Sequence, residues 1–162
     1  MLGAGGAVEI EARLVCLPDA GFLLRVGSYA KAYYLELDRG SSSLQQISNS
    51  KSPGYAELLK QHGHKKHFDT NLDTFSVLSI SLSHGRRDLL RAAMKNKEGA
   101  HLWKFCAWED FVPERVLIEP VFYPCEGEPS SLVKRKEEPI AASGGVSGDV
   151  SEPRPGRTLA RT

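Results

Sequence analysis

Residues 74–97, TFSVLSISLSHGRRDLLRAAMKNK, contain the two elements that decide the predicted fold. The apolar run from Phe75 to Leu82 is typical of a buried strand, and Ser83 stands where a helix N-cap belongs. A helix over residues 84–97 is therefore predicted to pack on this strand. Its periodicity predicts that it buries four apolar side chains: Leu89, Leu90, Ala93 and Met94.

The same helix carries a basic stripe. Arg87, Arg91 and Lys95 are spaced at i, i+4 and i+8, which places them on one helix face. Residues 51–97 hold nine Lys or Arg residues against four acids, although the net charge of the whole chain is only +1. Any anion site is therefore a local patch. The stripe predicts either a surface for phosphate backbones or acidic partners, or a solvated helix face without a ligand.

A histidine cluster precedes the strand, in HGHKKHFD at residues 62–69. His62, His64 and His67 are of a metal-ligating type, but Lys65 and Lys66 between them would repel a cation. The segment is read as a polar loop, and a phosphate-contacting basic loop is the alternative. No metal site and no cofactor are assigned.

Two further residues, Tyr34 and His84, are considered for a functional role. Tyr34 shares a predicted strand face with Glu36 and Asp38, so it is the aromatic side chain expected to stack on a nucleic-acid base. His84 is read as a polar residue of the first helical turn, because no partner for acid–base catalysis is identifiable from the sequence. The candidate nucleic-acid-binding residues are therefore Lys60, Lys65, Lys66, Arg87, Arg91, Lys95 and Tyr34.

The rest of the chain is predicted to be largely extended. Strands are expected at residues 8–16, 22–26, 33–38, 44–47, 75–82, 101–108 and 116–123, and a second, short helix begins at Ser52-Pro53. Residues 64–74 read as a loop. The predicted fold class is α+β, with a mainly antiparallel, bent or barrel-like sheet of about six or seven strands and two helices. Serial hairpins in residues 8–47 argue against a doubly wound parallel sheet.

Composition divides the chain into two parts. Residues 126–162 contain no Phe, Trp, Tyr or Cys, so they are predicted to be a disordered tail after a folded domain at residues 1–125. Cys16, Cys106 and Cys125 are odd in number and form no CxxC motif, which predicts free thiols and a cytoplasmic or nuclear protein. No run reaches about 18 apolar residues, so no membrane segment is expected.

One resemblance concerns the order of elements. YYLELDRG at residues 33–40, followed later by FSVLSISLSHGRRDLL at residues 75–90, resembles the strand and helix order of PUR-repeat and Whirly single-stranded nucleic-acid binders. The resemblance covers less than half of the chain, and it implies no particular site residue.

Common catalytic motifs are missing: GxxxxGK[ST], GxGxxG, GxSxG and HExxH do not occur. Their absence favours a non-catalytic protein, although catalytic groups can also be assembled from scattered residues. The sequence therefore predicts a non-catalytic interaction module or a subunit of a larger protein complex. The alternative is a module that binds RNA or single-stranded DNA through helix 84–97 and the 60–67 loop.

Overall fold

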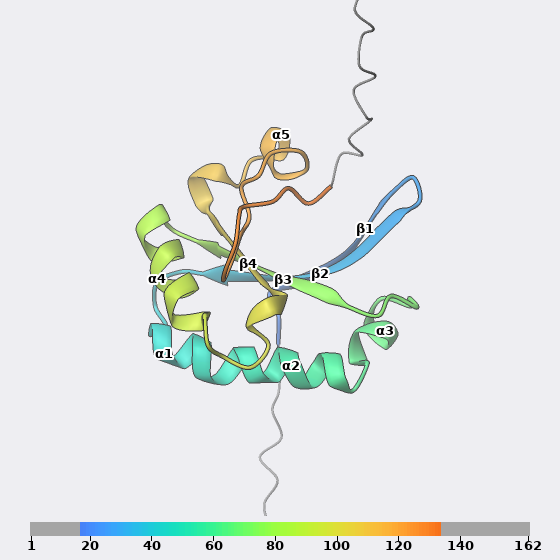
Figure 1. Ribbon diagram of the computed structural model, residues 1–162, viewed down its shortest axis with the longest axis horizontal. Helices are drawn as coiled ribbons and strands as arrows, with labels where there is room; N and C mark the ends of the chain where they lie inside the picture. The colour runs from blue at the N-terminus through green and yellow to red at the C-terminus, as the bar shows by residue number, and fades with distance from the viewer. Residues whose placement is uncertain (1–16, 134–162) are drawn as a thin grey trace, which may run out of the picture.

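The computed structural model describes residues 17–133, which form a five-stranded mixed sheet with helices on both faces (Figure 1). The strands follow the chain in the order β1 to β5 across the sheet. Their bounds are β1 Ala20–Val26, β2 Tyr29–Asp38, β3 Phe75–Ser81, β4 Trp103–Ala107 and β5 Tyr123–Pro124. The helices are α1 Leu44–Gln46, α2 Ser52–Lys60, α3 Gly63–His67, α4 His84–Met94 and α5 Pro113–Val116.

Three shorter helical turns complete the described elements. A π-helical turn, η1, covers Ile47–Lys51 and joins α1 to α2 without a break. Two 3₁₀ turns flank the fourth strand, namely η2 at Ala100–Leu102 and η3 at Trp108–Asp110.

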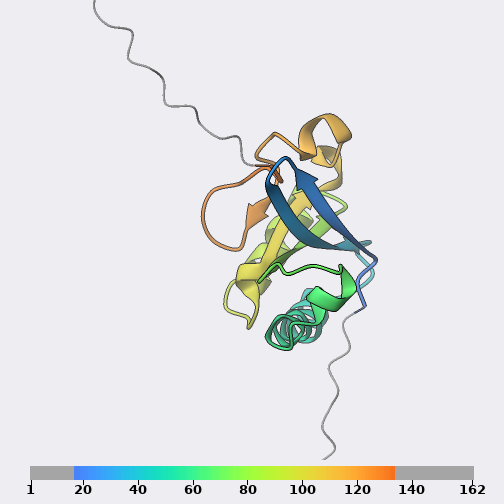
Figure 2. The ribbon, with the colours of Figure 1, turned by 90° about the vertical axis from the view of Figure 1, so that its right-hand side faces the viewer.

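The centre of the sheet is parallel. β1 and β2 form an antiparallel hairpin, whose turn contains Gly27 at φ 57°, a backbone conformation that favours glycine. β2 pairs in parallel with β3, and β3 pairs in parallel with β4, because a helical connection carries the chain back each time. β5 adds a short antiparallel edge. Figure 2 shows the hairpin standing at one edge of the sheet.

Each face of the sheet has its own core. Helices α1, α2 and α4 cover one face, called here the helix face, where Tyr34, Tyr55 and Trp103 are buried with Leu90 and Met94. The other face is covered by α5 and the segment after it, and its core includes Tyr33, Leu78, Ile80, Cys106, Val121, Phe122 and Leu132. The central strand β3 is buried along its whole length, as expected of a parallel strand that is covered on both faces.

The predicted sheet was wrong in three respects. It has five described strands and not six or seven, it is mixed and not mainly antiparallel, and it is open and not barrel-like. Residues 44–47 are helical, because the Ser43 hydroxyl accepts from the Gln46 amide and caps α1. Leu44 and Ile47 are three residues apart, a spacing that fits a helix as well as a short strand.

Other elements differ as well. Residues 116–123 contain the end of α5 and a loop, and only the last of them belongs to β5. The predicted 64–74 loop begins inside α3, so the described residues hold more than the two helices expected. The predicted helix at Ser52-Pro53 is α2, but Ser52 is its first residue and not its cap, because the turn η1 precedes it and its hydroxyl donates to the Glu98 carbonyl at 2.6 Å.

The strand and helix of residues 74–97 are confirmed. β3 spans Phe75–Ser81, and the Ser83 hydroxyl accepts a hydrogen bond from the Arg86 amide at the start of α4. Leu90 and Met94 are fully buried as predicted. Leu89 is not, because 56% of its surface is exposed.

Some predictions lie partly outside the described residues. Strand 8–16, Cys16 and residues 134–162 are among these. Within the described part, packing continues past Cys125: Leu132 is buried, and Ser130 pairs with Phe122. The domain boundary near residue 125 stays a prediction. Cys106 and Cys125 are free thiols. None of the helices in residues 17–133 is long and apolar enough to cross a membrane.

Candidate functional site

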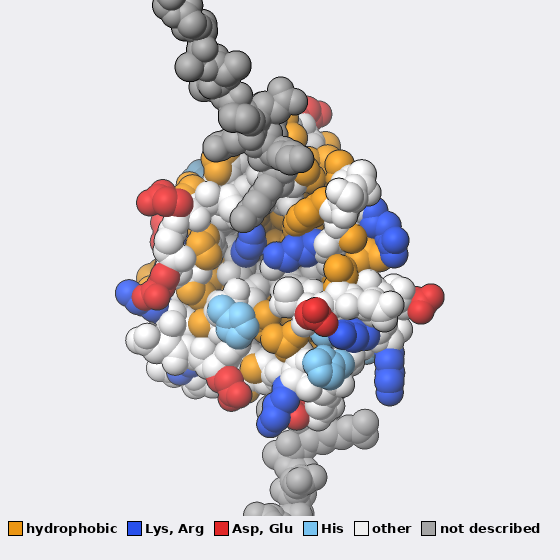
Figure 3. Space-filling view, turned by 45° about the vertical axis from the view of Figure 1, so that its right-hand side comes forward, with side chains coloured by type: hydrophobic (Ala, Val, Ile, Leu, Met, Phe, Trp, Pro, Cys, Tyr) orange, Lys and Arg blue, Asp and Glu red, His pale blue; other side chains and the backbone are white. Residues whose placement is uncertain are grey.

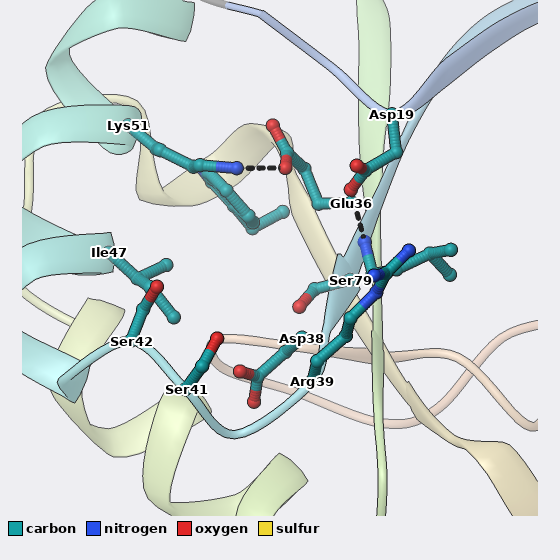
Figure 4. Close-up of a pocket in the computed structure, with 11 residues that line it drawn as sticks. Asp19, Glu36, Asp38, Arg39, Ser41, Ser42, Ile47, Lys51 and Ser79 are labelled. Atoms are coloured by element: carbon teal, nitrogen blue, oxygen red, sulfur yellow. Dashed lines mark hydrogen bonds and ion pairs between the residues drawn. The ribbon is translucent and has the colours of Figure 1, made fainter.

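A cavity opens on the helix face of the sheet, near the carboxyl ends of β2 and β3 (Figure 4). Its volume is about 180 Å³. The lining residues come from β1's start, β2, the loop after β2, η1 and the two parallel strands beyond: Asp19, Glu36, Leu37, Asp38, Arg39, Ser41, Ser42, Ile47, Lys51, Ser79 and Trp103.

Strand alternation brings two carboxylates into this cavity. Glu36 and Asp38 lie on the same face of β2 as Tyr34, and both are nearly buried, with exposures of 4% and 8%. Glu36 pairs with Ser79 on β3, and Asp38 pairs with Ser81. The end of the helix face is therefore polar, while its centre is aromatic and aliphatic.

Glu36 is held by two donors. Its Oε2 forms an ion pair with the Lys51 ammonium, which Figure 4 shows reaching toward it from the helical segment. Its Oε1 accepts from the Tyr55 hydroxyl at 2.6 Å. Lys51 is the last residue of the π-helical turn η1, and such turns occur frequently at functional sites. The Lys51 side chain is 40% exposed, so its ammonium also faces solvent at the cavity.

Asp38 is fixed by an arginine from another element. Arg86, in the first turn of α4, donates from Nε to Oδ2 at 2.6 Å and from a terminal nitrogen to Oδ1 at 3.2 Å. The same guanidinium donates to the Ser42 carbonyl at 2.7 Å. The hydrogen bond to Asp38 raises the pKa of Arg86. This contact joins the start of α4 to the end of β2.

A third carboxylate lines the cavity from the bend before β1. The Asp19 amide donates to the Leu35 carbonyl at 3.0 Å. Asp19 Oδ2 accepts from the Leu37 amide at 2.8 Å, which fixes the carboxylate at the cavity.

Two buried polar atoms on the helix face of the sheet have no protein partner among the described residues. They are the indole Nε1 of Trp103 and the hydroxyl of Ser81. Both residues are 1% exposed. Trp103 lines the cavity, and Ser81 stands across from Asp38.

The charges around the cavity are balanced. Three carboxylates face Lys51, Arg39 and the Arg86 guanidinium. In residues 17–133, no three His, Cys, Asp or Glu side chains are placed to hold a metal ion on their own. Mg²⁺ does not require such a cage, because it commonly binds one or two carboxylates and completes its shell with waters and substrate phosphates.

The basic side chains of the predicted α4 stripe contact other residues of the protein. Arg87 is only 8% exposed, and its guanidinium lies 4.1 Å from the centre of the Tyr123 ring. Arg91 lies over the same ring at 5.1 Å and donates to the Pro124 carbonyl at 2.9 Å. Lys95 forms an ion pair with Glu126 at 3.1 Å. The buried Arg87 therefore does not lie on a solvated helix face, whereas the Lys95 side chain stays 53% exposed.

The Tyr34 prediction also needs correction. Its face of β2 is the helix face, so Tyr34 is 3% exposed and not available for stacking on a base. Its hydroxyl forms a hydrogen bond of 2.6 Å with His67 Nδ1. The polarity of Glu36 and Asp38 suggested a solvent face, but those residues point into the cavity region.

The remaining predicted lysines lie around α3. Lys60 is exposed and 3.5 Å from Glu57, Lys65 forms an ion pair with Asp73 at 3.0 Å, and Lys66 is exposed. Nucleic-acid binding by these three residues stays a prediction. They lie away from the cavity, at the end of the sheet where β3 begins.

The histidines have different surroundings in the structure. His64 is buried, and its Nε2 lies 2.8 Å from the Leu72 carbonyl, while His62 is exposed. His84 does have acidic neighbours: Asp110 at 2.8 Å and Glu109 at 3.2 Å. These contacts join the start of α4 to η3.

The residues that the sequence reading missed are Asp19, Glu36, Asp38 and Lys51. One signal for them was present, since two acids with i, i+2 spacing end an otherwise apolar strand and so share one face. Nothing in the local sequence linked them to Asp19 or Lys51. Comparison with protein-family models, with curated proteins and with solved structures finds no match for this chain.

Proposed function

We propose that the cavity binds a divalent cation and hydrolyses a phosphodiester bond in a nucleic acid. The observation that carries this proposal is that Asp19, Glu36 and Lys51 line one open cavity, with the Lys51 ammonium paired to Glu36. Carboxylate oxygens are the ligands that Mg²⁺ prefers, and a neighbouring cation stabilises charge on a phosphoryl group.

The roles follow from position. Asp19 and Glu36 both line the cavity and would supply carboxylate oxygens to the cation. Lys51 lies beside Glu36 and neutralises a phosphoryl oxygen, while Arg86 holds Asp38 in place at the end of β2. A divalent cation held there would polarise the phosphoryl group and activate a water for attack on phosphorus, with departure of the ester oxygen and its protonation by solvent water.

Nucleic acid is the substrate class that the surroundings favour. Arg39 adds a cation at the cavity, and the hydroxyls of Ser41 and Ser42 are neutral donors there. RNA or single-stranded DNA is therefore the proposed ligand. Free Cys106 and Cys125 support a cytoplasmic or nuclear location for it.

The test is a hydrolysis assay with labelled RNA and single-stranded DNA, with Mg²⁺ or Mn²⁺ and with chelator. The parent should cleave only with the metal, and Glu36→Gln and Lys51→Gln should each lose about a hundredfold or more in rate. Glu57→Gln is the matched control, because Glu57 also pairs with a lysine but lies outside the cavity. Cleavage that persists in Glu36→Gln, or that needs no metal, would refute the assignment of this cavity.

A second function is supported by a separate observation. Leu82 and Trp108 directly follow the neighbouring ends of β3 and β4, and they are 60% and 58% exposed. Large exposed apolar side chains at one end of a sheet suit a protein partner. The protein would then be a non-catalytic interaction module or complex subunit, as the missing motifs suggest. Affinity purification with and without nuclease treatment separates this function from nucleic-acid association.

A further inference from the structure

One edge of the sheet has no strand beside it among residues 17–133. β1 is the first strand in the order β1 to β5, and within these residues its backbone makes no hydrogen bond beyond the ladder with β2. It is seven residues long, and Arg25 is its only charged residue. Natural proteins usually shorten, charge or cover their edge strands, because an open edge pairs with other strands. The free edge of β1 is therefore suited to receive a further strand.

The two faces of β1 differ in chemistry. Phe22 and Leu24 pack at the border of the core opposite the helix face and stay partly exposed, and Val26 on the same side is 46% exposed. Arg25 alternates to the helix face, where it lines a hollow of about 540 Å³ with Lys65, Lys66, Asp69, Thr70 and Asn71. Figure 3 shows Lys, Arg and His side chains gathered on the face that contains the hairpin and α3. A strand that fits this edge is apolar on one face and acidic near Arg25 on the other.

We propose that residues 8–16 of this chain pair antiparallel with β1 as a sixth strand. These residues lie outside the described part of the chain, and the proposal rests on their sequence and on the β1 edge. Their apolar residues alternate with charged ones, since Val8, Ile10, Ala12, Leu14 and Cys16 are separated by Glu9, Glu11 and Arg13. The chain bends at Asp19, directly before β1. Residues 17–19 then supply a three-residue connection, a common length in hairpins.

The side-chain pattern selects one register. A three-residue connection puts Leu14 opposite Phe22 and Glu11 opposite Arg25, so apolar meets apolar and acid meets base. A shift by one residue would turn the acids onto the Phe22 side. A shift by two would put Arg13 opposite Arg25, or would leave a single residue for the connection. The register with Glu11 opposite Arg25 is therefore the one that satisfies both faces.

The added strand would complete what β1 leaves open. Its backbone would pair with the amides and carbonyls of β1 that point away from β2. Its apolar side chains would cover Phe22 and Leu24, and the Glu11 carboxylate would lie beside the Arg25 guanidinium at the hollow. Arg25 forms no ion pair within residues 17–133, so this contact would be its first. The proposal does not depend on the hydrolysis proposed for the cavity.

Disulfide trapping tests the register. Glu11→Cys with Arg25→Cys, combined with Cys16→Ser and Cys125→Ser, should crosslink within the chain under mild oxidation, because directly opposed residues have the Cα separation that a disulfide needs. Glu9→Cys with Arg25→Cys is the matched control. Glu9 lies on the same face but two residues out of register, so its crosslink should form at least about tenfold more slowly. Equal rates in the two variants, measured by mass spectrometry of the linked peptides, would overturn the proposal.

Hydrogen exchange measured by nuclear magnetic resonance tests the pairing without new cysteines. The β1 amides that point away from β2 should exchange at least about tenfold more slowly in the parent than in an Ile10→Asp, Leu14→Asp variant, because those carboxylates would face Phe22 and Leu24. The β1 amides that bond to β2 should be protected in both proteins, which verifies that the variant is folded. Equally fast exchange of the outward amides in parent and variant would contradict a sixth strand.

A second copy of the chain is the alternative occupant of the β1 edge. A crosslink that joins two chains, or protection of the outward amides that increases with protein concentration, would assign the edge to that copy and overturn the proposal. A crosslink within one chain, at a rate that dilution leaves unchanged, is the result that the proposal predicts.

Discussion

Two regions of this protein, helix α4 and the end of strand β2, carry closely spaced charged residues. Their charged side chains have different surroundings in the structure. The cations of α4 recur at helical spacing and end up against Tyr123, Pro124 and Glu126, where protein groups take up their charge. The acids of β2 are nearly buried, yet they line an open cavity together with Asp19 and Lys51. Charge against a protein surface serves packing, whereas charge lining a cavity is available to a ligand. The comparison therefore favours the cavity as the functional region.

The largest stability difference between the two regions should come from Arg86. Its side chain is 21% exposed and that of Asp38 is 4% exposed, so Arg86→Ala leaves a buried carboxylate without its ion-pair partner. The unfolding free energy should fall by about 3 kcal/mol. Lys95→Ala, whose pair with Glu126 is exposed on both sides, should cost less than about 1 kcal/mol. Urea denaturation measures both.

A double variant provides the control. Arg86→Met with Asp38→Leu removes both charges, so stability should recover part of the loss. If Arg86→Ala and Lys95→Ala cost the same, the distinction between a buried and an exposed ion pair at these positions is wrong.

The next effect concerns the α4 stripe as a whole. Replacing Arg87, Arg91 and Lys95 by Glu would leave stability unchanged if the stripe were free, as the sequence suggested. The structure predicts a loss of about 2 kcal/mol, because two cation–π contacts with Tyr123 disappear. Thermal denaturation measures the loss, and faster proteolysis after residue 120 should accompany it. An unchanged melting temperature would show that these contacts contribute little in solution.

These two regions also show which structural features could be predicted from the sequence. The β3–α4 unit was predicted because its apolar run, N-cap and helical spacing are all local. The parallel pairing of β2 with β3 was not predicted from the sequence. It depends on the helices that connect the two strands and not on the residues of either strand. The partners of Arg87 and Arg91 lie more than 30 residues away, at Tyr123 and Pro124, so spacing on the helix could not reveal them.

The cavity was missed for a related reason. Alternation on β2 correctly put Tyr34, Glu36 and Asp38 on one face, but polarity suggested that this face meets solvent. Both faces of β2 are covered, so its polar residues mark the end of the core and not the outside. Asp19 and Lys51 reach the cavity from the start of β1 and from a π-helical turn, which the sequence did not predict.

A smaller effect is expected from pH at the start of α4. The hydrogen bond from His84 lowers the pKa of Asp110 below its usual value of 3.8, and Arg115 contributes in the same direction. A carboxyl whose pKa is lower in the folded state stabilises the fold above the unfolded pKa. This stability is lost as the pH falls through the folded value. His84→Ala should reduce the decrease in melting temperature below pH 3.8. An identical acid profile in the variant would contradict this coupling.

The smallest expected signal is the reactivity of the thiols. Burial raises the pKa of Cys106 to about 12 and that of Cys125 to about 11, so neither is a thiolate at neutral pH. Iodoacetamide should modify neither in the folded protein and both after unfolding, as mass spectrometry would show. Rapid labelling of Cys125 in the native protein would indicate that the segment after β4 opens readily.

The most direct test of the central claim is a titration with Mn²⁺, monitored by electron paramagnetic resonance, in the parent and in Asp19→Asn. Asparagine retains an oxygen that can accept from the Leu37 amide, so the variant should keep its fold while losing one anionic ligand. The parent should bind one Mn²⁺, and Asp19→Asn should bind it at least tenfold more weakly. Glu57→Gln, outside the cavity, should match the parent. Equal Mn²⁺ affinity in the parent and Asp19→Asn, or no binding by the parent, would contradict the assignment of a cation site to this cavity.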